Sequence, residues 1–170
     1  VTYGNGSATC TVTVKNAALK LSASTKTIYT KGTPSTVTVK AAKTGVTGTV
    51  KYTSSNAKVA TVNAAGKVTA KKAGTVTITA KCGSLTATYN ITVRKPVLTL
   101  KTKAAVSIKK GKTTTIKAAA TPKATVTYRS SDARIAKVNS KGVVTGVKKG
   151  KATITVTANG VSKKVVVTVK

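Results

Sequence analysis

The sequence predicts an all-β protein built from two tandem antiparallel β-sandwiches, and three observations lead to this prediction. A stretch of the chain occurs twice, as residues 51–80 and 127–156, with Tyr52 and Tyr128 in the same register. Self-similarity at a fixed spacing indicates one folding unit used more than once. Apolar and polar residues alternate within each copy, which is typical of half-buried strands. Thr, Val, Ala and Lys dominate the composition, as they do on solvated strands.

Residues 1–15 resemble the end of a repeat and not its beginning. Residues 6–15 match residues 83–94, and both resemble the final ten residues of the chain. The dipeptide Asn5-Gly6 lies near the expected hairpin turn, and Asn-Gly is a strong signal for such a turn. We therefore expect residues 1–15 to be the C-terminal hairpin of a preceding repeat.

The first complete repeat covers residues 17–94. Leu19 and Leu21 alternate in a first strand, a glycine turn follows, and Val37 and Val39 begin the next strand. Alternation then continues to the end of the repeat, as expected for the half-buried strands of an antiparallel sheet.

The second repeat covers residues 96–170, with Leu98 and Leu100 in the matching first strand. Counted between the glycine turn and the tyrosine, the second repeat is three residues shorter, and we place this difference in the loop before Tyr128. Length changes of this kind are tolerated in surface loops. No helical period is visible, and short strands at regular spacing with Gly and Asn between them favour a sandwich.

A specific run of short motifs carries a resemblance to a known family. Tyr-Thr-Ser-Ser-Asn, Val-Ala-Thr-Val-Asn, Gly-Lys-Val-Thr-Ala and Ala-Gly-Thr-Val-Thr-Ile-Thr-Ala follow one another from Tyr52, and a variant run begins at Tyr128. The run resembles the bacterial immunoglobulin-like group 2 (BIg2) domain over nearly the whole chain. The resemblance implies small Ig-like sandwiches in tandem, as on intimin- and invasin-like adhesins, secreted polysaccharide-degrading enzymes and phage tail proteins.

The chain departs from that family in two respects. The family often has Trp where this chain has Tyr52 and Tyr128, and its surfaces commonly carry acidic residues. This chain has 31 basic residues and a single acidic one, Asp132, which gives a net charge of +30. The scarcity of carboxylates argues against a calcium-dependent role, because calcium sites are built from several oxygen ligands.

The basic charge has two interpretations, because net charge bears on partners and solubility and not on fold. It is either a solvating lysine coat or a surface that attracts an anionic polymer, such as a cell-wall polymer or an acidic glycan. Side chains that read bases are sparse, so we expect nucleic acid to bind only non-specifically and with strong salt dependence. The candidate polyanion contacts are lysine pairs at turns or strand ends: Lys71, Lys72, Lys109, Lys110, Lys148, Lys149, Lys163 and Lys164.

The sequence contains no recognisable catalytic or metal-binding constellation. General acid–base catalysis needs His or paired carboxylates, and the chain has no His and one carboxylate. Zinc sites need clusters of Cys or His. We therefore expect no enzyme activity, no cofactor and no metal. Asp132 is predicted to cap a turn, because Asn56 stands at the matching place in the first repeat and both side chains accept local backbone hydrogen bonds. No apolar run approaches the roughly 18 residues that a membrane span needs.

The tyrosines fall on alternating strands. Tyr52 and Tyr128 are predicted to be the core aromatics of the two sandwiches. An alternative role, stacking on sugar rings, requires several exposed aromatics, for which Tyr3, Tyr29 and Tyr89 are the remaining candidates.

The two cysteines occupy opposing sides of the final hairpin, but in different repeats. Cys10 matches Tyr89 of the first repeat, and Cys82 matches Tyr3 of the preceding one. We expect two unbridged thiols. A bridge would form only if residues 1–15 docked onto the first sandwich or onto another molecule.

Together these patterns favour a non-catalytic segment of a secreted or cell-surface bacterial protein. Its expected role is an adhesive stalk or spacer, with neighbouring Ig-like repeats as its partners. The alternatives are a cationic module that holds anionic cell-wall polymers or extracellular glycans, and an accessory repeat of a carbohydrate-active enzyme or a phage tail protein.

Overall fold

The computed structural model describes residues 2–4, 6–7 and 16–170, and this part of the chain is built from strands and turns. No helix in the described residues is suited to crossing a membrane. The first sandwich consists of β3 (Ala18–Leu21), β4 (Thr25–Tyr29), β5 (Thr36–Thr38), β6 (Ala41–Thr44), β7 (Lys51–Ser54), β8 (Ala60–Val62), β9 (Lys67–Ala70), β10 (Gly74–Cys82) and β11 (Leu85–Arg94).

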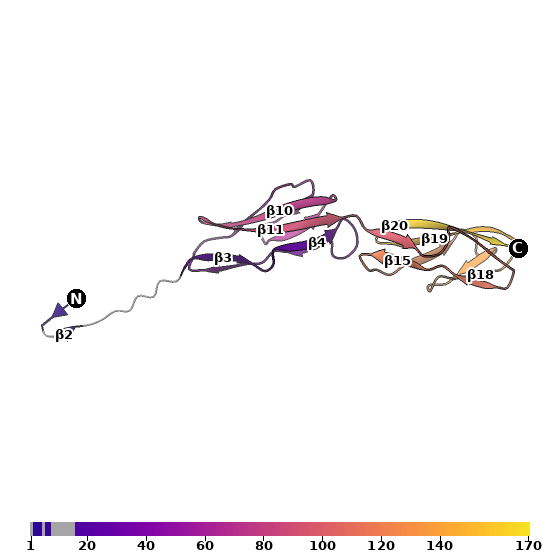
Figure 1. Cartoon of the computed structure of the whole chain (residues 1–170), viewed down its shortest axis with the longest axis horizontal. Coiled ribbons are helices and arrows are strands. Elements are labelled where there is room, and N and C mark those ends of the chain that lie inside the picture. Colours follow the sequence, from indigo (N-terminus) through magenta and orange to yellow (C-terminus); the bar gives the residue numbers. More distant parts are fainter. Residues whose placement is uncertain (1, 5, 8–15) are drawn as a thin grey trace.

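The second sandwich repeats this order of strands. It consists of β12 (Val97–Leu100), β13 (Ala105–Ile108), β14 (Thr113–Thr115), β15 (Ala118–Thr121), β16 (Thr127–Ser130), β17 (Ala136–Val138), β18 (Val143–Gly146), β19 (Gly150–Ala158) and β20 (Val161–Val169). Figure 1 shows the two sandwiches lying end to end, with β11 leading into the second one. The prediction of tandem all-β sandwiches is confirmed.

Each sandwich opposes one four-stranded sheet to two smaller sheets. In the first sandwich, the sheet with strand order β4-β11-β10-β7 faces the sheets β3-β6 and β5-β9-β8. In the second sandwich, the sheet with strand order β13-β20-β19-β16 faces the sheets β12-β15 and β14-β18-β17. One pair in each four-stranded sheet is parallel, namely β4 with β11 and β13 with β20. The four-stranded sheets are therefore not purely antiparallel. After β3 and β12 the chain crosses to the opposite sheet, where β4 and β13 run in the same direction as β11 and β20, the last strands of the two sandwiches.

A long hairpin forms the centre of each sandwich. The β10–β11 ladder pairs residues from Gly74↔Val93 to Cys82↔Leu85, and the β19–β20 ladder pairs residues from Gly150↔Val169 to Ala158↔Val161. Because side chains alternate across a strand, every second residue of these strands points inward. Both hairpins are therefore buried on one face and solvated on the other.

Two separate cores result from this alternation. Ile78 and Ile154 are fully buried at matching places, and burying such a side chain stabilises the fold by about 1.5–3 kcal/mol. The first core contains Ile28, Val39, Val59, Ala60, Val68, Val76, Ile78, Tyr89, Ile91 and Val93. The second contains Leu98, Ile116, Ala136, Val144, Ala152, Ile154, Val156, Ala158, Val165, Val167 and Val169.

A tyrosine packs over a glycine at the same place in both sandwiches. Gly142 has φ +77°, and a Cβ added there would lie 2.6 Å from the Ile116 carbonyl oxygen and 2.8 Å from Tyr128 Cζ. Gly66, with φ +74°, has the same relation to Val39 and Tyr52. These glycines are required both for their left-handed backbone and for the close approach of the ring.

The length difference between the repeats lies mainly in a different turn from the one predicted. Sheet register makes Ile28 equivalent to Ile108, and Val37 equivalent to Thr114. Eight residues lie between Ile28 and Val37 in the first repeat, whereas five lie between Ile108 and Thr114 in the second. The extra length is therefore in the turn after β4, and assigning it to the loop before Tyr128 was wrong. Gly32 and Gly111 do not occupy equivalent positions relative to the sheet, so counting residues from these glycines placed the length difference in the wrong loop.

Most of residues 1–15 lies outside the described residues. Within that segment, β1 (Thr2–Tyr3) pairs antiparallel with β2 (Gly6–Ser7). The hairpin prediction for 1–15 as a whole stays a prediction.

The tyrosine–glycine contact yields a first testable prediction. Gly111 also has a left-handed backbone, with φ +77°, but a Cβ there meets nothing within 4 Å. Gly111→Ala should therefore cost only the conformational strain, about 1–2 kcal/mol. Gly142→Ala should cost about 1–3 kcal/mol more, because the methyl group overpacks against the Ile116 carbonyl oxygen and the Tyr128 ring. Urea unfolding of both variants measures the difference, and equal losses would contradict the close packing described around Gly142.

Candidate functional site

Within the described residues, no group of three or more His, Cys, Asp or Glu side chains comes together. The chain offers a single carboxylate side chain, Asp132, and no histidine. Hydroxyls, amides and ammonium groups are therefore the chemistry available on this surface.

Asp132 is held in a local turn of the second sandwich. Its Oδ1 accepts the backbone N–H of Arg134 at 2.9 Å, and its carboxylate also accepts the Arg134 guanidinium at 3.2 Å. These hydrogen bonds lower the pKa of the Asp132 carboxyl below its usual value. In the first sandwich Asn56 Oδ1 accepts the Lys58 N–H at 3.0 Å in the same way. The prediction that Asp132 caps a turn is confirmed.

The neighbouring turn is capped by an asparagine in each sandwich. Asn63 Oδ1 accepts the N–H groups of Ala65 and Lys67, at 3.1 and 2.9 Å. Asn139 Oδ1 accepts those of Lys141 and Val143, both at 3.0 Å. Because the repeats preserve these bonds, the asparagines act as structural caps of the tight turns.

The predicted lysine contacts are all exposed, but they do not form one surface. Lys148 and Lys149 lie beside Asp132 and Arg134 around an open depression at one end of the second sandwich. Lys109 and Lys110 follow β13 at this same end, where the Lys110 N–H donates to the Lys170 carbonyl at 3.1 Å. The remaining predicted lysines lie elsewhere: Lys71 and Lys72 in the first sandwich, and Lys163 and Lys164 near the start of β20.

The same end carries two lysines that the sequence interpretation did not select. The Lys112 carbonyl accepts the N–H of Gly146 at 3.0 Å, and Gly146 stands two residues before Lys148. The Lys170 N–H donates to the carbonyl of Ile108, the residue before Lys109, at 2.9 Å. We call this group the end cluster. It consists of Lys109, Lys110, Lys112, Lys148, Lys149 and Lys170. Only the lysine pairs had a sequence signal, since Lys112 and Lys170 stand singly.

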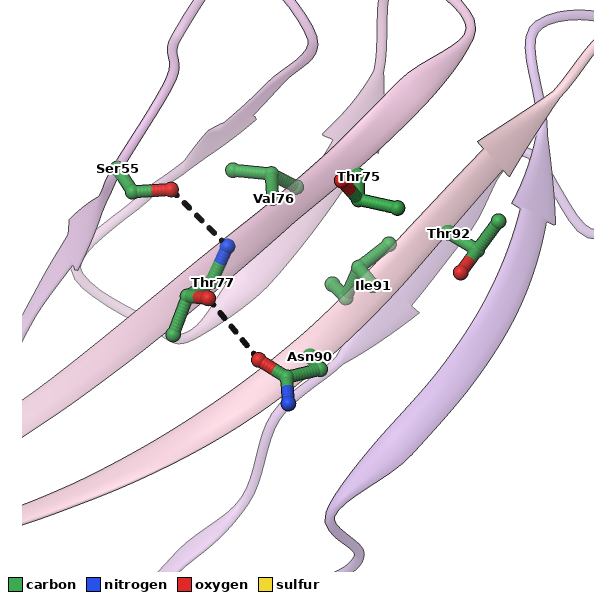
Figure 2. Close-up of a pocket in the computed structure, with 7 residues that line it drawn as sticks. All are labelled: Ser55, Thr75, Val76, Thr77, Asn90, Ile91 and Thr92. Atoms are coloured by element: carbon green, nitrogen blue, oxygen red, sulfur yellow. Dashed lines mark hydrogen bonds between the residues drawn. The ribbon is translucent and has the colours of Figure 1, made fainter.

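A shallow polar depression lies on the outer face of the first four-stranded sheet. Figure 2 shows Thr75, Thr77, Asn90 and Thr92 there, with Ser55 at its margin. Thr77 Oγ1 donates to Asn90 Oδ1 at 2.9 Å, and Ser55 Oγ accepts the Thr77 N–H at 3.0 Å. The depression holds no titratable group, so its chemistry is restricted to neutral hydrogen bonding.

This depression is not repeated in the second sandwich. Sheet register places Val166 where the first sandwich has Asn90, since Thr77 pairs with Asn90 and Thr153 pairs with Val166. Val166 is 39% exposed. The serine cap beside it is kept, because Ser131 Oγ accepts the Thr153 N–H at 2.9 Å.

The tyrosines are distributed between core and margin. Tyr52 and Tyr128 are partly buried and pack against the two cores, and burial raises the pKa of Tyr128. Tyr89 is 3% exposed, and its burial likewise raises its pKa. Tyr89 was a candidate for sugar stacking, and the structure removes it, because its ring lies inside the first core. Tyr29 is half-buried at the end of β4, and nothing is described of the Tyr3 side chain.

Cys82 is a buried free thiol at the end of β10. Its sulfur lies 3.6 Å from the Thr47 carbonyl oxygen and 3.8 Å from that of Gly48. Cys10 lies outside the described residues, so the prediction of two unbridged thiols stays a prediction.

Comparison with known families identifies the repeats. The family model of the bacterial Ig-like domain (group 2) matches residues 23–93 and again residues 96–169. The chain belongs to this family. The resemblance found in the motif run from Tyr52 is thereby confirmed, and the two sandwiches are tandem bacterial Ig-like domains. Comparison with curated proteins gives no match.

Several solved structures are similar to the chain. The S-layer protein rSbsC is 25% identical, with a TM-score of 0.46, over 92% of this chain and 28% of that chain. Domains 4 and 5 of the S-layer protein SbsC are also 25% identical, with a TM-score of 0.44, over 93% of this chain and 99% of theirs. A mutant of intimin from EHEC O157:H7 is 30% identical, with a TM-score of 0.35, over 45% of this chain and 39% of that chain. The chain thus spans 28% of the length of the first of these proteins.

The single carboxylate side chain leads to a prediction about acid stability. Acid unfolding usually follows protonation of carboxylates that are paired in the native state. The folded pKa of Asp132 is lowered, so its contribution is present above its unfolded pKa of about 3.9 and is lost as pH falls through the folded pKa. We expect the free energy of unfolding to stay flat from pH 7 to 5 and to fall slightly below pH 4.

Asp132→Asn is the matched variant for this prediction, because Asn56 already fills the equivalent cap. The fall below pH 4 should shrink to what the terminal carboxyl contributes. Urea unfolding at pH 7, 5 and 3 measures both proteins. A loss of stability between pH 7 and 5, or an undiminished acid loss in the variant, would contradict this assignment.

Proposed function

We propose that the chain is a non-catalytic spacer in an extracellular protein of the bacterial surface, where it holds other parts of that protein apart. Family membership supports this role, because two domains of one kind follow each other directly. The observation that carries the proposal is the end-to-end arrangement of the two sandwiches (Figure 1). β11 ends at Arg94 and β12 begins at Val97, so only two residues join the domains.

The surface chemistry also supports a role without catalysis. The described residues contain no cluster of metal-binding or acid–base side chains, and the depressions are open and shallow. Enzyme active sites usually combine a concave pocket with titratable groups of perturbed pKa. An adhesive role for the whole protein would then belong to parts that this spacer presents.

Small-angle X-ray scattering tests the spacer proposal. A spacer of this kind should give a skewed pair-distance distribution with a long tail, because two sandwiches in line form a rod. The profile should be the same at low and high salt, since the domains are joined by packing and a short linker and not by long-range charge. A symmetric, bell-shaped distribution would mean that the sandwiches fold back on each other, and it would contradict the proposal.

The end cluster favours a second candidate function, the binding of an anionic polymer. Its six lysines gather where the nearby carboxylate side chain, that of Asp132, is already paired with Arg134. Clustered like charges raise the local potential and attract polyanions, and salt screens this attraction over a Debye length of about 8–10 Å.

Two quadruple variants test this candidate at equal change in net charge. One replaces Lys109, Lys110, Lys148 and Lys149 with Gln, and its matched control replaces Lys71, Lys72, Lys163 and Lys164. Binding to teichoic acid and to a polyuronic acid is measured at two salt concentrations. A site at the end cluster predicts a much larger loss in the first variant and steep weakening with salt. Equal losses would indicate a diffuse field, and no binding at low salt would leave only a solubilising role.

A further inference from the structure

Two turns from different domains meet beside the linker. In the first domain, residues 30–35 connect β4 to β5 and are called the 30–35 turn. This turn is longer than the matching turn after β13 in the second domain. In the second domain the β19–β20 hairpin closes with Asn159 and Gly160, which we call the 159–160 turn. Figure 1 places the facing ends of the two sandwiches at this point.

Gly32 of the 30–35 turn lies directly against the Asn159 side chain. A Cβ added to Gly32 would overlap Asn159 Oδ1, and it would lie 2.6 Å from Asn159 Cγ. Gly32 also has φ +83°, a left-handed conformation that favours glycine. The absence of a side chain at this position therefore allows the two domains to touch.

Asn159 is fixed from its own side of the contact. Its Nδ2 donates to the Pro122 carbonyl at 2.6 Å, and Pro122 is buried in the second domain. In the described residues Asn159 is the one non-glycine position with positive φ, at 50°. Asparagine tolerates this conformation better than most residues. The turn is thus anchored to its own domain while it contacts the other.

The second residue of the turn adds another contact. A Cβ on Gly160 would lie 3.0 Å from Lys31 Cδ, so the aliphatic part of Lys31 covers this glycine. The 30–35 turn is itself tied to the strand that leads into the linker, because the Thr30 N–H donates to the Arg94 carbonyl at 2.9 Å. The linker is then only Lys95 and Pro96, and proline restricts its backbone.

We propose that the 30–35 turn and the 159–160 turn form an interdomain latch that fixes the orientation of the second Ig-like domain relative to the first. Relative motion is the default for domains that share a small interface. The latch adds a second attachment beside a two-residue linker, so that bending there must break specific contacts. The inference rests on the proposed spacer function and deepens it, because a stiff joint would let the spacer set the orientation of the parts it separates as well as their distance.

Residual dipolar couplings of the whole chain test the latch. The two domains should share one alignment tensor in the native protein. Gly32→Ala should abolish this agreement, because the methyl group displaces Asn159. Gly111→Ala is the matched control: it has φ +77° and open space around its Cβ, so it carries the same backbone strain without touching the joint. The control should keep the shared tensor.

A second variant separates the latch from backbone strain. Asn159→Gly keeps the left-handed turn accessible and removes both the bond to Pro122 and the contact with Gly32. It should also lose the shared tensor, while amide spectra show both domains still folded. The proposal is overturned if the native domains already align independently, or if both variants keep one tensor. An elongated scattering profile with independent tensors would refute the latch and leave the spacer proposal intact.

Discussion

The pairing of the last two long strands determines the geometry of each domain. In β10–β11 and β19–β20, continuous ladders fix which residues point inward. A shift of one residue would turn every buried side chain of the strand towards solvent, so the register is strongly specified. The buried positions of these strands, such as Ile78 and Ile91, then determine what the smaller sheets must cover. In the same sheet, the tyrosine of β7 or β16 packs against the core and over Gly66 or Gly142.

The same hairpins also connect the fold with its proposed role. Each hairpin is closed by a turn, and the turn of the second hairpin reaches the preceding domain through Asn159. Their solvent faces are left with Thr, Asn and Lys, which hydrogen-bond locally or stay hydrated. An organisation of this kind provides a stable rod with polar sides, and it leaves the ends of the sandwiches as the places where contacts are made.

Sequence reasoning predicted what depends on local patterns. The repeated stretch at residues 51–80 and 127–156, with its alternation of apolar and polar residues, predicted tandem sandwiches. Asn56, at the place in the first repeat that matches Asp132, predicted the turn caps. It did not find β4 or its parallel pairing. That strand, Thr-Lys-Thr-Ile-Tyr, buries only Ile28 fully, so it has little apolar alternation of its own. Its place is determined by β11, a partner far away in the sequence.

The sequence also gave no sign of contacts between separate turns. Asn159-Gly160 reads as an ordinary hairpin turn, and nothing local indicates that its side chain meets Gly32 of the other domain. The end cluster was found only in part for the same reason, because the approach of Lys112 and Lys170 follows from strand pairing. Contacts of this kind depend on the assembled fold and have no local signature.

Native-state hydrogen exchange tests most directly the claim that one hairpin organises each domain. Amides that open only on global unfolding exchange slowest, whereas locally opening segments exchange faster. The paired amides of β10–β11 and β19–β20 should therefore be the slowest in their domains, with β3–β6 and β12–β15 exchanging earlier. If the amides of the small sheets were the slowest and the long hairpins opened first, the hairpins would not be the organising element of the fold.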